Sequence, residues 1–302
     1  MLTPVLMVLL VLSEKPLVPL DTRVEQVWTG GEFTEGPAVG PDGGIYFSDI
    51  GNAIMKFDPA SKKTTVFRRP SGRSNGLDFD AEGRLVACEG ANTGGNRRIT
   101  RTTRDGTVEV VADRWDGKRF NSPNDLIIDR EGRIYFTDPR YVGDEPREID
   151  TESVFRIDRD GKVTRLITDV KKPNGIALSP DMKMLYLADS GPTTRQLLAY
   201  PLRSDGTVGP KKVLHDFGKD RGVDGMCLDE AGRIYATAGQ GKTGGVTIFS
   251  PEGKKLGFIP TPEAPSNCIF GGKERSTLYI TAGKSLYRID LATRGFAIFW
   301  PK

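Results

Sequence analysis

Six polar residues, spaced 40 to 50 residues apart along the chain, are of the types whose side-chain oxygens bind metal ions. Each opens the same short phrase: a polar residue, an apolar stretch, a turn and a strand such as Ile45–Asp49. In four copies a glycine follows eight residues later: Gly43, Gly83, Gly132 and Gly232. We call the six the head residues, and they are Glu35, Asn75, Asn124, Asn174, Asp224 and Asn267.

Four of the head residues suggest a metal centre. Glu35 and Asp224 bring two negative charges, and Asn124 and Asn174 bring neutral amide oxygens. Such an all-oxygen set suits a hard divalent cation, Ca²⁺ first, with water completing the six to eight positions that it prefers. Mg²⁺ and Mn²⁺ are alternatives, and Zn²⁺ is a weaker one because no His or Cys stands among the heads. Asn75 and Asn267 are expected to support the ligands or to hydrogen-bond a substrate.

A simpler alternative is that the heads only cap strands, because Asn and Asp often satisfy backbone groups in turns. Capping explains any one position well. It does not explain why two of the six heads are acidic, which favours the metal centre.

The reaction chemistry is narrowed by what the sequence lacks. The only histidine, His215, lies in the segment Lys211–Phe217, which resembles an outer strand far from the heads. A Ser-His-Asp hydrolase needs its imidazole beside the nucleophile, so this mechanism is excluded. The glycine-rich segment Gly90–Gly95 precedes no helix and is interpreted as a loop, not a phosphate-binding motif. Hydrolysis assisted by a cation, which polarises a carbonyl or phosphoryl oxygen, remains the natural chemistry.

The spacing of the heads predicts the elements that position them, because repeats of this length are typical of propeller blades. Each unit is predicted to hold four strands; in the third they are Asn124–Asp129, Arg133–Asp138, Val154–Asp158 and Val163–Asp169. We therefore predict an all-β fold: a six-bladed β-propeller of four-stranded antiparallel blades, formed by residues 21–302 as one domain.

Two segments compete for the place of the last outer strand. Val24–Trp28 precedes the first head as a fourth strand precedes the later ones, and it is expected to close the ring against the last unit. Gly295–Trp300 is the other candidate for the outermost strand, and the sequence does not decide between them.

Topology predicts where the heads point. In an up-and-down sheet, the start of the first strand and the end of the second lie at the same edge. The heads should therefore converge on one rim, and the insertion Tyr141–Thr151 should fold over it. Other segments expected on this rim are Ser48-Asp49, Glu89, Asp138–Tyr141, Asp189-Ser190 and Gly239-Gln240.

Composition bounds the partners and the compartment. The 302 residues carry a net charge of +3, and no basic run suggests nucleic acid.

The apolar run Leu2–Leu12 is too short to span a bilayer but has the length of a signal-peptide core. We predict that residues 1–20 are a signal peptide or, alternatively, a disordered N-terminus. With a signal peptide, the mature protein is expected to be periplasmic or secreted, without membrane insertion. Because no Lys or Arg precedes the run, a cytoplasmic protein is the alternative.

The three cysteines, Cys88, Cys227 and Cys268, form neither a disulfide framework nor a zinc signature. They are predicted to be packed core thiols.

Five short motifs stand out along the chain: Glu35-Gly-Pro, Asn121-Ser-Pro-Asn-Asp125, Tyr135-Phe-Thr-Asp-Pro139, Pro173-Asn-Gly175 and Asp224-Gly. Together they resemble the gluconolactonase-like family that includes regucalcin, also called senescence marker protein 30. The resemblance runs from about Val24 to the C-terminus. It implies a six-bladed propeller with one catalytic divalent metal, usually calcium, and hydrolysis of sugar lactones or, in some relatives, of other lactones or organophosphates.

The same resemblance assigns roles. It implies that Glu35, Asn174 and Asp224 bind the metal, with Asp224 also the proposed base, and that Asn124 is a ligand or contacts substrate or water. Asp125 is expected to orient these groups or the substrate. Regucalcin-type members have an arginine two residues before that Asn, where this chain has Ser122. Arg119, Asn121 and Arg140 are candidates to replace it; the expected substrate contacts are Asn75, Asn121, Asp125, Arg140 and Tyr141.

The leading hypothesis is therefore an exported, metal-dependent hydrolase that opens a small sugar lactone, with Asp224 and Asn124 as catalytic residues. One alternative keeps the metal but changes the substrate to a phosphotriester. The other is a non-catalytic propeller that binds a ligand or a protein on its rim and holds a structural calcium.

Overall fold

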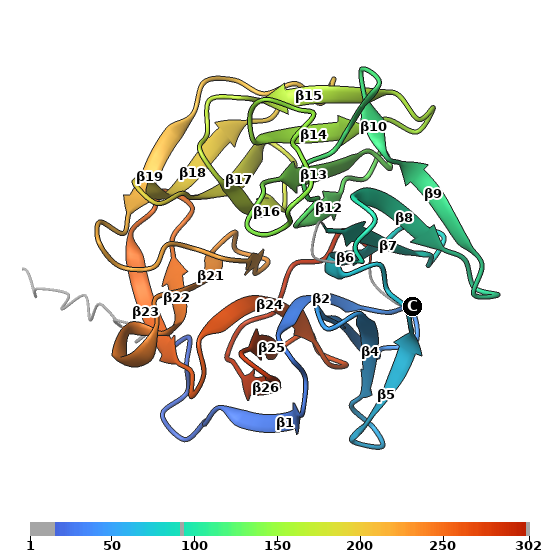
Figure 1. Ribbon diagram of the computed structural model, residues 1–302. Helices are drawn as coiled ribbons and strands as arrows, with labels where there is room; N and C mark the ends of the chain where they lie inside the picture. The colour runs from blue at the N-terminus through green and yellow to red at the C-terminus, as the bar shows by residue number, and fades with distance from the viewer. Residues whose placement is uncertain (1–15, 91–93, 300–302) are drawn as a thin grey trace, which may run out of the picture.

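The computed structural model describes residues 16–90 and 94–299 (Figure 1). The apolar run Leu2–Leu12, predicted to be the core of a signal peptide, lies outside these residues. Within them, no helix is both long and apolar enough to cross a membrane. A short 3-10 turn, η1 (Gly241–Thr243), is the one helical element that the described ranges contain.

The described residues form six four-stranded antiparallel sheets arranged around a central axis, which confirms the predicted six-bladed β-propeller (Figure 1). The first strands of neighbouring blades contact one another around the ring. The first three blades consist of β2 (Thr34–Val39), β3 (Ile45–Asp49), β4 (Ala53–Asp58) and β5 (Lys63–Arg68); β6 (Ser74–Phe79), β7 (Leu85–Glu89), β8 (Arg98–Thr102) and β9 (Val108–Ala112); and β12 (Leu126–Ile128), β13 (Ile134–Asp138), β14 (Ser153–Ile157) and β15 (Val163–Ile167).

The other three blades follow the same order. They consist of β16 (Pro173–Leu178), β17 (Met184–Ser190), β18 (Arg195–Pro201) and β19 (Lys212–Asp216); β20 (Met226–Leu228), β21 (Ile234–Ala238), β22 (Gly245–Phe249) and β23 (Lys255–Pro260); and β24 (Pro265–Gly271), β25 (Thr277–Ala282) and β26 (Ser285–Asp290), completed by β1 (Glu25–Thr29). A small hairpin of β10 (Arg114–Trp115) and β11 (Lys118–Arg119) was not predicted.

The ring is closed by the N-terminal strand. β1 pairs with β26 and is the outermost strand of the sixth blade, as expected for Val24–Trp28. The other candidate, Gly295–Trp300, is not that strand as far as the chain is described. Its Gly295 makes a single bridge to Asp229, and the following residues line the base of the central channel.

The predicted position of the histidine is also confirmed. His215 lies on β19, the outermost strand of the fourth blade, and its ring contacts those of Phe217 and Phe249. It is therefore remote from the first strands that surround the axis, and no Ser-His-Asp arrangement can form there.

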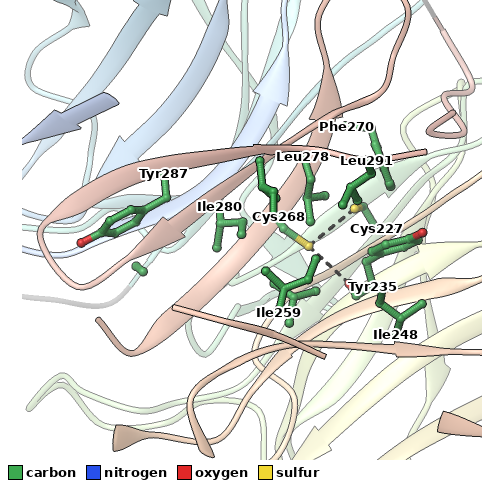
Figure 2. Packing of buried hydrophobic residues seen from close by; sticks show 13 residues of the cluster. Cys227, Tyr235, Ile248, Ile259, Cys268, Phe270, Leu278, Ile280, Tyr287 and Leu291 are labelled. Atoms are coloured by element: carbon green, nitrogen blue, oxygen red, sulfur yellow. Dashed lines mark hydrogen bonds between the residues drawn. The ribbon is translucent and has the colours of Figure 1, made fainter. Parts of the chain in front are cut away.

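Apolar clusters between neighbouring blades form the core. One of them joins the fifth and sixth blades, and Figure 2 shows its packing. Cys227 and Cys268 lie in it with their Sγ atoms 3.5 Å apart, and Cys268 also contacts the carbonyl oxygen of Tyr235. These cysteines and Cys88 are free and buried, as predicted for core thiols.

Glycines allow the blades to approach closely at the axis. The amides of Gly76, Gly175 and Gly225, each next to a head residue, donate to carbonyl oxygens of the next blade at 2.7 Å. A Cβ atom on Gly175 would lie 2.4 Å from the carbonyl oxygen of Asp224 and 2.8 Å from Cα of Gly225. The glycine is therefore required by close packing of backbone against backbone.

We predict that Gly175→Ala destabilises the protein by about 1–3 kcal/mol, because the added methyl group forces two first strands apart. Unfolding by urea, followed by circular dichroism, measures this change. Gly257→Ala is the matched control, since its Cβ would meet Ile248 at an ordinary 3.4 Å. Equal stability of the two variants would contradict the close-packing argument.

Candidate active site

Five of the six head residues line one cavity of about 570 Å³ at the axis: Glu35, Asn75, Asn124, Asn174 and Asp224. They come from five different blades, so the fold brings together residues that are far apart in sequence. In four of the blades, a register shift in the pairing of the first two strands lies at or beside the head residue; in the first blade it lies between Glu35 and Ala38. Such bulges re-aim side chains, which turns the heads toward the cavity.

The carboxylate of Asp224 is fixed by two neighbouring side chains. Its Oδ1 accepts a hydrogen bond from Nδ2 of Asn174 at 2.7 Å, and its Oδ2 pairs with the guanidinium of Arg221. Burial raises the pKa of Asp224 above its ordinary value, although Arg221 and Asn174 oppose this shift. Arg221 is itself fixed, because it donates to the carbonyl oxygen of Pro265 at 2.7 Å.

The negative charge of Glu35 is stabilised by fewer hydrogen-bond donors than that of Asp224. Its side chain is buried, with 4% of the residue exposed, and it accepts one hydrogen bond within the described residues, from the amide of Gly36 at 3.1 Å. Burial raises the pKa of Glu35 well above its ordinary value, and the negative charges of Asp224 and Asp125 raise it further. The negative charges of the two cavity carboxylates therefore repel each other.

Tyr141 lies at the mouth of the cavity, at the start of the insertion that was predicted to fold over the rim. Its hydroxyl accepts a hydrogen bond from Nδ2 of Asn174 at 3.0 Å, and the ammonium of Lys172 lies 4.8 Å from its ring centre. Burial of the hydroxyl, followed by the charge of Asp224, raises the pKa of Tyr141 well above its ordinary value. The phenol is therefore neutral and polar, and it faces the cavity although about half of the residue is exposed.

Asp125 and Asn267 lie deeper, where they line a second cavity of about 100 Å³ at the base of the channel. Asp125 accepts hydrogen bonds from the amides of Leu126 and Ile176, and from Nδ2 of Asn267 at 3.4 Å. Burial raises the pKa of Asp125 to about 7. These two residues connect three blades below the candidate site, and they do not line its cavity.

Two of the expected substrate contacts, Asn121 and Arg140, are also outside the lining of the cavity. Nε of Arg140 donates to the carbonyl oxygen of Asn121 at 2.9 Å, and Nη1 donates to that of Glu145. Both residues are buried and hold the inserted loop against the third blade. The structure places them as supports of the loop, whereas Ser122 lies on the cavity wall.

Three of the four acidic residues at the ends of second strands are occupied by backbone groups. The fourth, Glu89, accepts instead from the side chains of Arg68, Arg98 and Thr100. Asp49 accepts from the amides of Glu32 and Phe33, and Asp138 accepts from those of Asn121 and Ser122. Asp189 does the same for the segment that precedes the fourth blade. Asp49, Asp138 and Asp189 therefore fix the incoming chain, and Glu35 and Asp224 are the two carboxylates that line the cavity.

The sequence analysis missed the basic residues of the cavity wall. Arg73, Arg195, Lys219 and Arg221 all line it. They lie in connections between strands or at a strand end, outside the repeated phrase. The one available signal was Arg221, three residues before Asp224, a spacing at which a short turn brings the two charges together.

The donor atoms fit a hard divalent cation. Across residues 16–90 and 94–299, no group of three or more His, Cys, Asp or Glu residues forms a metal cluster. A cation here would need the amide oxygens of Asn124 and Asn174 in addition to the two carboxylates, a set suited to Ca²⁺ or Mg²⁺. The buried carboxylate of Glu35, raised in pKa and poor in donors, is the observation that supports this fit.

Comparisons with known proteins identify the family to which the chain is similar. The family model described as SMP-30/Gluconolactonase/LRE-like region matches residues 33–284. A gluconolactonase from Zymomonas mobilis is 32% identical over 92% of this chain and 84% of its own length. A lactonase, drp35, from Staphylococcus epidermidis is 32% identical over 76% of this chain and 69% of its own. The solved structure of a gluconolactonase from Xanthomonas campestris has a TM-score of 0.82 and 32% identity, covering 90% of each chain.

We predict that Glu35→Gln stabilises the cation-free protein by at least about 1 kcal/mol near pH 8, because it removes a poorly compensated buried charge. The folded-state pKa of Glu35 is raised, so its contribution to stability is complete below the unfolded value of about 4.3 and is lost as pH rises through the folded value. The advantage of the variant should therefore vanish near pH 4.

Urea unfolding in the presence of a chelator, at both pH values, measures this difference. The control is Glu252→Gln: Glu252 is exposed and its pKa is lowered by the Ser250 hydroxyl, so its replacement should bring no gain as pH rises. A Glu35→Gln variant that is less stable than the wild type near pH 8 would refute the electrostatic argument.

Proposed function

The chain belongs to the SMP-30/gluconolactonase/LRE-like family and is a lactone-hydrolysing enzyme, and we propose that it opens a sugar lactone at the cavity lined by Glu35 and Asp224. In this proposal Asp224 is the general base, and a divalent cation, most suitably Ca²⁺, is held by Glu35, Asn124, Asn174 and Asp224. The product is the corresponding hydroxy acid.

The observation that carries the proposal is the pair of carboxylates at the cavity wall. Buried carboxylates are normally paired with a cation or held by several donors. Here Glu35 has one donor, and its pKa is raised by burial and by the charges of Asp224 and Asp125. Two mutually repelling carboxylates beside neutral amide oxygens are a suitable site for a hard cation and for chemistry at an ester carbonyl.

The bound cation would supply Lewis-acid polarisation of the lactone carbonyl. Asp224 takes the proton from the attacking water, as a general base within hydrogen-bond reach of that water. Asn174 and Arg221 fix the carboxylate of Asp224 in one orientation through their hydrogen bonds. This orientation keeps the base directed at the cavity during the reaction.

In this proposal, the neutral polar side chains of the cavity wall bind the substrate. Asn75, Ser122 and Asn124 line the cavity and can hydrogen-bond sugar hydroxyls. The phenol of Tyr141, held by Asn174, adds a polar contact at the mouth. Ser122 stands where regucalcin-type relatives carry a substrate-binding arginine, so sugar recognition here must rely on other groups.

We predict that Asp224→Asn reduces kcat/KM for D-glucono-1,5-lactone at least about 100-fold, since it removes the base but keeps the shape of the side chain. A pH-stat assay of acid release, corrected for spontaneous opening, measures the loss. Asp181→Asn is the control, because Asp181 lies in a hairpin turn with Ser179 and Lys183, outside the cavity. Full activity of the Asp224 variant would exclude the assigned base.

We also predict that a chelator abolishes turnover and that Ca²⁺ restores it. The pKa values of Glu35 and Asp224 are both raised in the cation-free protein, so binding must displace protons. Affinity for Ca²⁺ should therefore fall between about pH 8 and about pH 5, with proton release on binding. Calorimetry in buffers of different ionisation enthalpy measures both effects. Cation binding without hydrolysis of any lactone would instead favour a non-catalytic binding propeller.

A further inference from the structure

The wall of the candidate cavity carries more positive than negative charge. Arg73, Arg195, Lys219 and Arg221 line it, against the two carboxylates of Glu35 and Asp224. A divalent cation on the carboxylates would cancel their charge and leave the basic groups uncompensated. A neutral sugar lactone carries no negative charge that could pair with this excess of positive charge.

Two of the four basic residues have partners that account for them. Arg221 pairs with Asp224 and donates to the carbonyl oxygen of Pro265, so its charge belongs to the catalytic carboxylate. Arg73 donates to the carbonyl oxygen of Ile50 at 3.0 Å and makes other contacts. The excess therefore concentrates on the side of the cavity where Arg195 and Lys219 lie.

Arg195 and Lys219 are not neutralised by the protein. Within the part of the chain that the structure describes, neither takes part in an ion pair, and Arg195 donates only to the carbonyl oxygen of Gly218, at 3.1 Å. The acids of this loop are engaged elsewhere. Asp216 accepts from Gln196 and the amide of Gly218, and Asp220 accepts from Thr243 and the amide of Arg221.

Local packing keeps Arg195 at the cavity wall. Gly222 also lines the cavity, and a Cβ there would lie 3.1 Å from Cβ of Arg195 and 3.3 Å from Oγ of Ser190. The glycine leaves room for Arg195 to stand beside the segment that leads to Asp224. Guanidinium groups bind carboxylate, phosphate and sulfonate oxygens through paired N–H donors, and a lysine adds an adjustable point charge.

We propose that Arg195 and Lys219 form an anion-binding subsite and that the preferred substrate is a sugar lactone bearing a second, negatively charged group: a carboxylate, a phosphate or a sulfonate. The inference rests on the proposed lactonase function and names the substrate class of that same site. The lactone ring lies toward Glu35 and Asp224, and the charged substituent lies toward the basic side. The subsite also attracts such substrates over a distance, which makes their binding sensitive to salt.

The test uses matched substrates. D-Glucaro-1,4-lactone and D-glucono-1,4-lactone differ at C6, where the first carries a carboxylate and the second a hydroxymethyl group. A 6-phosphorylated D-glucono-1,5-lactone, compared with its unphosphorylated form, serves as the phosphate arm. We expect the wild-type holoenzyme to favour the charged member of at least one pair by about tenfold or more in kcat/KM, as two partly exposed charge contacts allow.

Substitutions of the two basic residues test whether they cause the preference for charged lactones. In Arg195→Gln/Lys219→Gln the ratio of charged to neutral kcat/KM should fall about tenfold, mainly through KM, and Lys219→Gln alone should lower it by a smaller factor. Arg203→Gln removes the same charge just beyond the opposite end of β18, where Arg203 bonds to Val208, and should leave the ratio unchanged. Circular dichroism verifies folding of each variant.

The outcomes separate this inference from the proposed function. Failure of the wild type to hydrolyse any of the four lactones would overturn the proposed function. Hydrolysis of neutral lactones without preference for a charged one, or a preference that the double variant retains, would overturn the anion subsite alone. Salt provides a test that needs no variant: raising NaCl to about 0.5 M must reduce the wild-type ratio, and an unchanged ratio contradicts the subsite.

Discussion

The close approach of neighbouring first strands at the axis is the constraint on which the site depends. The amides of Gly175 and Gly225 donate to carbonyl oxygens of the next blade at 2.7 Å. A Cβ atom on Gly175 would clash with the backbone of that blade, and one on Gly225 would clash with the side chain of Asn267. The same approach brings Glu35, Asn174 and Asp224 to one cavity from three blades. A looser ring would separate the two carboxylates and remove the electrostatic coupling between them.

The electrostatic repulsion between Glu35 and Asp224 destabilises the cation-free protein, and neighbouring groups offset this repulsion only in part. Asp224 is fixed by Asn174 and Arg221, whereas Glu35 receives a single amide. Below them, Asp125 adds a third negative charge, and burial raises its pKa to about 7. Functional sites commonly retain such locally unfavourable groups because the surrounding fold holds them in place. A cation would relieve the repulsion, which links metal binding, stability and catalysis to the same two side chains.

The fold and much of the site could be predicted from the repeat, because equivalent positions in a closed ring must face the same axis. This reasoning correctly brings Glu35 and Asp224 to one cavity and puts His215 on an outer strand. It does not give depth along the axis: Asn267 occupies a head position yet lies at the base of the channel, bonded to Asp125. Spacing along the chain also could not show that Asn121 and Arg140 support a loop, since the hydrogen bond that joins them is between a side chain and a carbonyl oxygen 19 residues away.

The residues that sequence reasoning missed show how the molecule divides its tasks. The repeated phrase supplies the carboxylates and amides, whose positions follow from blade geometry, and the connections between strands supply Arg195, Lys219 and Arg221. Repetition says nothing about these connections, because each has its own length and path. Arg221 still serves the ring, since its guanidinium is bound to Asp224. Arg195 and Lys219 make no such ion pair, so their positive charges are available to a ligand in the cavity. In our proposal, substrate selectivity therefore depends on the connections between strands, which the repeat does not determine.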